Sequence, residues 1–287
     1  MPTSFNKKIL IMDGSHYLYR AYYGVPESAK LPSGLKVNAV YGFMAYLRKV
    51  VKVVEPTGIV VIFDSETGIT DKVAQEKSYK ANRDYTDVGM YEQLPLIKEI
   101  LEYVLIKYVE PQNHEADDYI GSLARKFSND DTLSLIFSND ADFLQLISAN
   151  INVVKMGQKV PEIIDIPAFR EKYGFNNNLY LDYLSLKGDD SDNIKGVPGI
   201  GHKTAQNLVS GYGSLDDIYS NLDFLQKRIK ILLMENRQIV EYNKNFLKIN
   251  TNISCHDLDL KDVGNNIISE LNQSTNYLLY KVGINIK

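Results

Sequence analysis

Three apolar runs of the chain each lead into aspartate, and this repeated pattern constrains the fold more than any other feature. The run "ILIMD" closes on Asp13, "GIVVIFD" closes on Asp64, and "TLSLIFSNDAD" carries Asp140 and Asp142. Short apolar runs bounded by turn residues are typical of buried strands. Helical patterns stand between them, and strands that alternate with helices indicate a parallel α/β sheet.

The connecting segments support this fold class. Apolar residues recur at helical spacing from Val37 to Glu55 and again in "YEQLPLIKEILEYVLI". A further helix begins within "HEADDYIGSLARKF", whose apolar stripe predicts packing on a core. The run "NINVVKM" predicts a fourth strand, and from about Ile166 the pattern is almost wholly helical.

Acidic residues follow the predicted strands at the edge where a parallel sheet binds ligands. Helices of such folds start at the same edge, so the set expected there is Asp13, Asp64, Glu115, Asp117, Asp118, Asp140 and Asp142. Any one of them alone could be a turn former or could complement a helix dipole, an effect of about 0.3–1 kcal/mol. Convergence from three strand ends and one helix start favours metal ligands, because packed carboxylates repel one another unless they are protonated or bound to cations.

An oxygen-only ligand set selects Mg²⁺ or Mn²⁺. Two such ions roughly 3.5–4 Å apart are a common device for phosphodiester hydrolysis. The composition agrees with this chemistry, since no His/Cys cluster resembles a zinc site. The sequence therefore predicts a two-metal site at the edge of the sheet.

A second acidic cluster precedes a glycine-rich turn in "GDDSDNIKGVPGIGHKTA". The acids are Asp189, Asp190 and Asp192, and the turn carries Gly196, Gly199 and Gly201 followed by Lys203 and Thr204. Glycines let a backbone approach a partner, and the next helix would aim its first amides at a phosphate. This form favours a helix-hairpin-helix, which contacts a nucleic-acid backbone without reading its sequence. An ordinary corner between two helices is the alternative.

Basic and aromatic residues alternate in "KVAQEKSYKANRDY", just after Asp64. Lys72, Lys77, Lys80 and Arg83 stand there among tyrosines, a mixture that suits single-stranded nucleic acid. The residue types alone would fit a solvated loop equally well. Their position directly after Asp64 favours a role at the active site. Arg20 lies seven residues after Asp13, where it could reach a phosphate or could be a surface residue.

Bulk composition narrows the class of protein. The 287 residues carry a formal net charge of −4, which excludes a uniformly basic surface but not a basic patch beside an acidic pocket. No apolar run reaches the length of a membrane span, and the N-terminus lacks a signal-peptide pattern. The lone cysteine, Cys255, rules out an intrachain disulfide and fits a reducing cytoplasm.

Six of these motifs together resemble the 5′-nuclease (flap endonuclease) superfamily, most of all the 5′→3′ exonuclease domain of bacterial DNA polymerase I. They are "IMDGSHYLYRAYY", "VVIFD", "YKANR", "HEADDYIGSLA", "FSNDADFLQL" and "GDDSDNIKGVPGIGHKTA", in the order of the family. The resemblance implies a PIN-like parallel-sheet nuclease core over residues 1–187, with a helical arch at about 66–92. It implies a helical DNA-binding region with the helix-hairpin-helix over residues 188–287.

The resemblance also implies roles for individual residues. One metal would be held by Asp13, Asp64, Glu115 and Asp117, and the second would be held or oriented by Asp117, Asp140, Asp142, Asp189 and Asp192. Asp118 matches an acid of the family that either binds a metal directly or supports a residue that does. Lys80 and Arg83 match a basic pair that engages the scissile phosphate, with Arg20 near the same phosphate, and the hairpin is expected to bind K⁺.

Two departures from the family concern the arch. Lys72 stands where the polymerase-linked domains usually carry arginine, and "RDYTDVG" replaces a proline-bearing stretch. No polymerase sequence follows Lys287, so the resemblance is to the small stand-alone members, with all the acids of the second site present.

The sequence thus predicts a metal-dependent 5′→3′ exonuclease and flap endonuclease of replication and repair, acting as a monomer in the cytoplasm near the nucleoid. Its expected partners are DNA with a 5′ end or flap, an RNA primer and a separate DNA polymerase. The alternatives are a PIN-type single-strand ribonuclease, against which the helix-hairpin-helix argues, and a non-catalytic junction-binding protein, against which the carboxylates argue.

Overall fold

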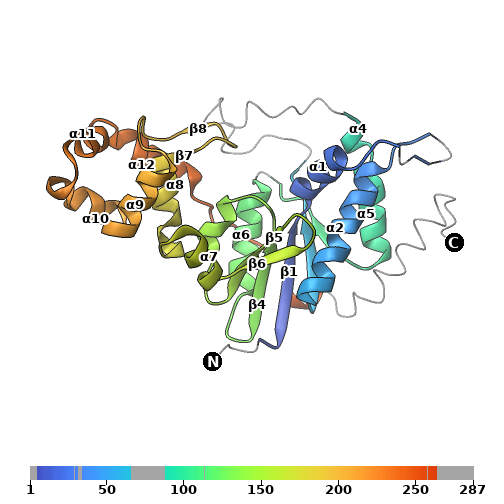
Figure 1. Cartoon of the computed structure of the whole chain (residues 1–287). Helices are drawn as coiled ribbons and strands as arrows, with labels where there is room; N and C mark the ends of the chain where they lie inside the picture. The colour runs from blue at the N-terminus through green and yellow to red at the C-terminus, as the bar shows by residue number, and fades with distance from the viewer. Residues whose placement is uncertain are drawn as a thin grey trace.

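The structure, a computed structural model, describes residues 5–28, 30–31, 34–65, 88–112, 114–256 and 258–263. A sheet with helices on both faces forms the core, and a bundle of helices lies to one side of it (Figure 1). The basic residues expected in the arch, Lys72, Lys77, Lys80 and Arg83, lie outside the described residues.

The main sheet has six strands in the order β3-β2-β1-β4-β5-β6. Their bounds are β1 Lys7–Asp13, β2 Gly58–Ile62, β3 Lys107–Val109, β4 Thr132–Phe137, β5 Ile151–Met156 and β6 Pro161–Ile164. All neighbouring pairs are parallel except β5 and β6, which are antiparallel. The predicted parallel α/β core is therefore confirmed, and Asp13 ends the central strand.

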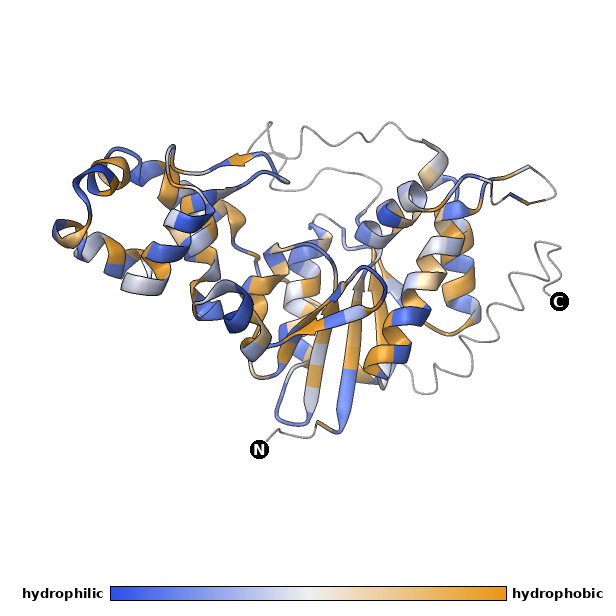
Figure 2. Cartoon of the chain, viewed as in Figure 1, coloured by the Kyte–Doolittle hydropathy of each residue, from blue (hydrophilic) through white to orange (hydrophobic). Residues whose placement is uncertain are grey.

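Helices cover the two faces of the sheet. On one face lie α1 Gly14–Gly24, α2 Asn38–Val54, α4 Val88–Tyr91 and α5 Leu94–Tyr103, and on the other lies α6 Ala116–Phe127. Side chains of β1 alternate between these layers: Ile9 and Ile11 pack on the α6 side, and Leu10 and Met12 pack on the α1–α2 side. Figure 2 shows the apolar residues concentrated on the strands and on the helix faces that meet them.

This alternation decides where the acidic residues point. Asp13 continues the series of Ile9 and Ile11, and Asp64 continues that of Val60 and Ile62, all of which pack on the α6 side. Both carboxylates are therefore directed toward the start of α6, the helix that carries the next three acids.

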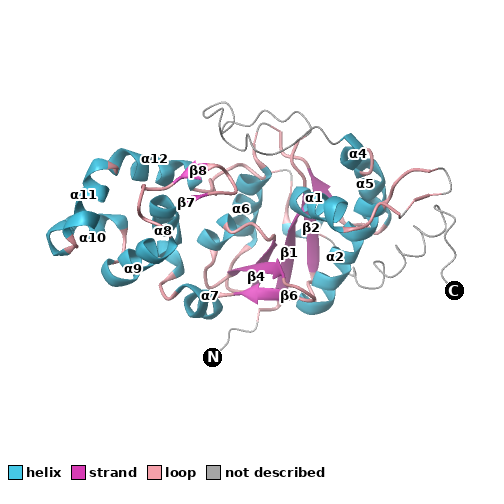
Figure 3. Cartoon of the chain, turned by 45° about the horizontal axis from the view of Figure 1, so that its top comes forward, coloured by secondary structure: helices cyan, strands magenta, loops and turns pink. Residues whose placement is uncertain are grey.

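The rest of the chain is mostly helical, as predicted (Figure 3). It contains η1 Asp142–Leu146 at the sheet edge, then α7 Ile166–Tyr173, η2 Asn177–Leu179, α8 Tyr180–Lys187, α9 His202–Tyr212, α10 Leu215–Ser220, η3 Leu222–Phe224, α11 Lys227–Glu235, α12 Arg237–Leu247 and η4 Leu260–Asp262. α8 packs against α9 and α12. No helix among the described residues is long and apolar enough to span a membrane.

Four short strands were not predicted. β3 is only three residues long, β6 pairs antiparallel at the sheet edge, and a two-stranded ribbon, β7 Gly188–Asp189 with β8 Ile194–Lys195, follows α8. Such short strands carry too few residues for a periodic pattern. The ribbon nevertheless has a consequence for function, because Asp189 lies on it and Asp192 lies in its loop.

Candidate active site

Asp13 is the centre of the first group of acids. It is buried, and it caps α1 by accepting a hydrogen bond from the backbone N–H of His16 at 2.9 Å. Its Oδ2 accepts a second hydrogen bond from the Ser138 hydroxyl at 2.8 Å. Asp13 therefore acts as a helix cap. Capping alone does not explain why its carboxylate is buried beside other acids.

Asp64 and the start of α6 adjoin Asp13. The backbone N–H of Ala116 donates to Asp64 Oδ1 at 3.1 Å, which joins the end of β2 to the first turn of α6. Glu115 is the buried N-cap residue of α6, and Asp117 lies in the first helical turn. The structure thus brings Asp13, Asp64, Glu115 and Asp117 to one edge of the sheet, as the sequence predicts.

Asp140 and Asp142 lie after β4 and are fixed by local hydrogen bonds. The backbone N–H of Asp140 donates to Ser138 Oγ at 3.1 Å, and the backbone N–H of Asp142 donates to Asp140 Oδ1 at 2.9 Å. Since Ser138 Oγ also donates to Asp13, one serine joins the central strand to this turn. Asp142 Oδ1 is buried and has no hydrogen-bond partner among the described residues.

The third acidic segment comes from the helical region. Asp189 and Asp192 are both buried, whereas Asp190 is exposed. Asp189 Oδ1 accepts from the backbone N–H of Ser191 at 2.8 Å and from its hydroxyl at 2.5 Å. The ribbon therefore supplies two inward acids and one outward acid.

Electrostatics connect these segments into one site. Burial, followed by the charges of Asp117 and Asp64, raises the pKa of Asp13 well above its ordinary value. Burial likewise raises the pKa of Asp142, and the charges of Asp140, Asp189, Asp192 and Asp117 add to the effect. Asp117 contributes to both, so it lies where the two groups of carboxylates meet.

The same residues suit a divalent cation by their chemistry. Among the described residues, no three Asp, Glu, His or Cys side chains are arranged as a ready-made metal site. The donors are all hard oxygens, and the partnerless Oδ1 of Asp142 is a buried acceptor that a cation would satisfy.

Two other predicted site residues make contacts outside the two groups of acids. Asp118 accepts a hydrogen bond from the backbone N–H of Asn250 at 2.8 Å. Arg20 lies on α1, with its guanidinium carbon 5.8 Å from the centre of the Tyr46 ring.

The glycines of the predicted hairpin divide into two kinds. A Cβ on Gly196 would lie 2.1 Å from the carbonyl oxygen of Lys187, so this glycine is required by the packing of the ribbon on the end of α8. Gly199 has φ +86° and is exposed, and a Cβ on Gly201 would have no heavy atom within 4 Å. The turn opens to solvent at the start of α9, where Lys203 is exposed.

Sequence reasoning missed three residues that organise the site. Ser138 follows the apolar run that ends at Phe137, and no motif marks it. Asn139 Oδ1 accepts from the Tyr17 hydroxyl at 2.9 Å and from the backbone N–H of Met156 at 2.8 Å. Lys155 Nζ donates to the Asn139 carbonyl at 3.1 Å, and burial lowers the pKa of Lys155 to about 8 despite the opposing charge of Asp140. A lysine inside the apolar run "NINVVKM" was the available signal.

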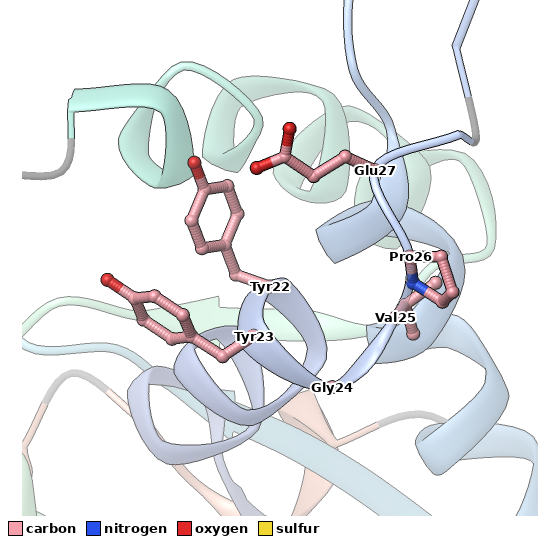
Figure 4. A pocket seen from close by; sticks show the side chains of 6 residues that line it. All are labelled: Tyr22, Tyr23, Gly24, Val25, Pro26 and Glu27. Atoms are coloured by element: carbon pink, nitrogen blue, oxygen red, sulfur yellow. The ribbon is translucent and has the colours of Figure 1, made fainter.

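A hollow of about 350 Å³ lies at the end of α1 and is lined by Tyr22, Tyr23, Gly24, Val25, Pro26 and Glu27. Figure 4 shows the two tyrosine rings and the Glu27 carboxylate around it. None of the predicted site residues lines this hollow, so the acidic edge remains the candidate active site.

Comparison with known proteins agrees with this arrangement. Residues 8–174 match the 5'-3' exonuclease N-terminal resolvase-like domain, and residues 175–268 match the 5'-3' exonuclease C-terminal SAM fold. The chain is 33% identical to the 5'-3' exonuclease of Aquifex aeolicus, over 89% of this chain and 87% of that protein. The chain belongs to the 5'-3' exonuclease family.

The chain is also similar to one longer relative and to two solved structures. The chain is 35% identical to DNA polymerase I of Caldicellulosiruptor bescii over 89% of its own length, but it spans only 31% of that polymerase. The fold is that of the T5 D15 protein, crystallised with metal ions (TM-score 0.68, 20% identity, 96% of this chain and 99% of that one). The catalytic core of Rad2 in complex with a DNA substrate has the same fold (TM-score 0.59, 16% identity, 97% and 88% covered).

Proposed function

We propose that the protein is a metal-dependent 5′→3′ exonuclease and flap endonuclease that hydrolyses DNA phosphodiesters near 5′ ends and flap junctions. The observation that carries this proposal is the position of Asp117, whose charge acts on both Asp13 and Asp142 and so joins two groups of carboxylates. Family membership and the DNA-bound and metal-bound relatives of the same fold support it.

Two Mg²⁺ or Mn²⁺ ions would supply a water of lowered pKa and positive charge beside the scissile phosphate. Asp13, Asp64, Glu115 and Asp117 would hold one ion, and Asp117, Asp140, Asp142, Asp189 and Asp192 would hold or orient the other. Burial, together with repulsion from the neighbouring carboxylates, raises the pKa of Asp13 and Asp142. Bound cations would offset that repulsion, so metal binding would also stabilise the assembled site.

The remaining residues of the chain would bind and orient the substrate. Ser138 fixes Asp13 relative to the Asp140 turn. Lys80, Arg83 and Arg20 would contact the scissile phosphate, with Lys72 and Lys77 along the single strand. The exposed turn at Gly199 and Gly201, with Lys203 and Thr204, would bind the duplex backbone and a K⁺ ion, while Gly196 serves the packing beneath it.

The proposal extends to the partners and the cellular location of the protein. The substrate would carry a 5′ flap or end, with an RNA primer as a further target, and the enzyme would act as a monomer beside a separate DNA polymerase. Its place would be the nucleoid in the cytoplasm. The nuclease core would extend over residues 1–187 and the DNA-binding region over residues 188–287.

One assay separates the three candidate functions. A 5′-labelled flap DNA and a single-stranded RNA are each incubated with the protein in Mg²⁺ and in EDTA. The proposal expects short 5′-labelled products from the flap only in Mg²⁺. Cleavage confined to the RNA would favour the PIN-type ribonuclease, and a gel shift of the flap without cleavage would favour a junction-binding protein.

A further inference from the structure

A segment of extended chain, residues 248–255, runs from α12 back to the nuclease core along α6, and we call it the strap. The backbone N–H of Asn250 donates to Asp118 Oδ1 at 2.8 Å. One turn further along α6, the buried Ser122 hydroxyl donates to the Asn250 carbonyl at 3.1 Å and accepts from the backbone N–H of Ile253 at 3.0 Å. The strap is thus hydrogen bonded to the helix that carries Asp117.

The strap also meets the second acid-bearing element. Gln145 of η1, three residues after Asp142, accepts from the backbone N–H of Ile249 at 3.1 Å and donates to the Leu247 carbonyl at 3.0 Å. α6 accommodates the strap closely, because a Cβ on Gly121 would lie 2.7 Å from Ile249 Cγ2. The segment from Leu247 to Ile253 therefore bridges the elements that carry Asp117 and Asp142.

The helix that precedes the strap, α12, contacts the third acidic segment. Asn243 of α12, which is buried, donates to the Ser185 carbonyl at 3.1 Å and to the Lys195 carbonyl at 2.9 Å. Ser185 lies on α8 just before the ribbon of Asp189 and Asp192, and Lys195 lies on the second strand of that ribbon. Movement of the strap relative to α6 would therefore change the spacing between acids that the proposed function requires to act together.

We propose that Asp118 is a positioning residue that fixes the strap to α6, and through it the spacing of the carboxylate groups, and that it is not a cation ligand. This inference rests on the proposed function for its catalytic consequence. Adjacent residues of a helix do not face the same way. Asp117 acts on Asp13 and Asp142, whereas Asp118 Oδ1 binds the strap. The role needs a hydrogen-bond acceptor and does not need a negative charge.

The substitutions Asp118→Asn and Asp118→Ala separate the two roles. The amide of asparagine keeps an acceptor oxygen for the Asn250 N–H, and alanine does not. Residues that orient metal ligands typically change metal affinity by about 10–100-fold when lost. We expect Asp118→Ala to weaken Mn²⁺ binding by about tenfold, and Asp118→Asn to recover most of that loss. Ser122→Ala, which loosens the same strap one turn away, should weaken Mn²⁺ binding in the same direction.

The decisive experiment combines amide hydrogen exchange at Asn250 and Ile253 with Mn²⁺ titration, in wild type and the three variants. Protection of the Asn250 amide that is lost in Asp118→Ala and kept in Asp118→Asn, with Mn²⁺ affinity following the same order, is the expected result. Equal loss of Mn²⁺ binding in Asp118→Asn and Asp118→Ala would show that the charge is needed and overturn the proposal. Unchanged Asn250 protection in Asp118→Ala would also overturn it. Hydrogen exchange reports on the strap even if the protein cleaves no DNA, so failure of the proposed function is recognised separately.

Discussion

The acidic edge of the sheet and the glycine turn before α9 are both conspicuous in the sequence, but the structure accounts for them in different ways. Gly196 has a packing role, because any side chain there would collide with the Lys187 carbonyl. The acids at the edge have the opposite character. The fold buries Asp13 and Asp142 beside other carboxylates and raises their pKa, which opposes folding at neutral pH.

The difference indicates how strongly each motif supports a function. The fold requires Gly196 whether or not the protein binds DNA, so this glycine is weak evidence for a DNA-binding hairpin. Buried charges that destabilise the fold need another explanation, and catalysis is the one that the family supplies. The exposed Gly199 and Gly201 lie between these cases, since packing does not require either of them to approach another backbone.

The largest expected effect is on the acidic edge. Asp117→Asn should reduce flap cleavage by about 10³-fold or more, since metal-based charge stabilisation contributes several kcal/mol. The melting temperature should stay the same or rise, because a repulsive charge is removed. Single-turnover cleavage and a circular-dichroism melt measure both quantities. Loss of folding in Asp117→Asn would mean that the acid serves the fold.

Substitutions in the glycine turn should change the stability of the protein, in contrast to Asp117→Asn. Gly196→Ala should destabilise the protein by about 3 kcal/mol, in the range of strongly strained substitutions. Gly201→Ala is the matched control, because a Cβ there meets nothing within 4 Å, and it should cost less than about 1 kcal/mol. Urea unfolding of both variants tests the contrast. Similar stabilities would remove the distinction between the packing glycine and the exposed one.

A smaller effect is expected in the pH dependence of stability without metal. Because the folded pKa of Asp142 is raised, its contribution to stability is present below the unfolded pKa and is lost as pH rises through the folded pKa. In EDTA, wild type should therefore lose stability relative to Asp142→Asn as the pH rises above about 4, the pKa of an unfolded aspartate. A difference of 1 kcal/mol corresponds to roughly 2–4 °C in melting temperature.

Melting curves of the two proteins across this pH range in EDTA, repeated in Mg²⁺, check the sign. The difference should shrink when Mg²⁺ is present, since a cation relieves the repulsion in wild type. A difference that does not vary with pH would contradict the assignment.

The smallest effect should come from Lys155, the cation beside the acidic turn. Lys155→Met removes a charge that competes with a metal ion, so it should tighten Mn²⁺ binding by about threefold, the scale of a partly solvated charge interaction. The exposed Lys159 provides the control, and Lys159→Met should leave the affinity unchanged. Isothermal titration of the three proteins measures the effect. Weaker Mn²⁺ binding in Lys155→Met would show that this lysine instead holds the turn in place.

Much of the core could be predicted because its information is local. The apolar runs of β1 and β2 locate the strand ends at which Asp13 and Asp64 lie, and the apolar stripe of α6 locates the helix whose first turn carries Asp117. The hydrogen bond between Asp118 and Asn250 could not be predicted, since its partners are 132 residues apart and one of them is a backbone amide. The role of Ser138 could not be predicted for a similar reason, because its hydroxyl joins Asp13 to the Asp140 turn through hydrogen bonds between separate segments of the chain.

The most direct test of the central claim is a Mn²⁺ titration of the metal-free protein and three variants, Asp64→Asn, Asp192→Asn and Asp117→Asn. Wild type should bind two ions per chain. Asp64→Asn and Asp192→Asn should each weaken one site, and Asp117→Asn should weaken both, because its carboxylate lies where the two groups of acids meet. An Asp117→Asn protein that keeps either site at wild-type affinity, or a wild type that binds no Mn²⁺, would contradict the account.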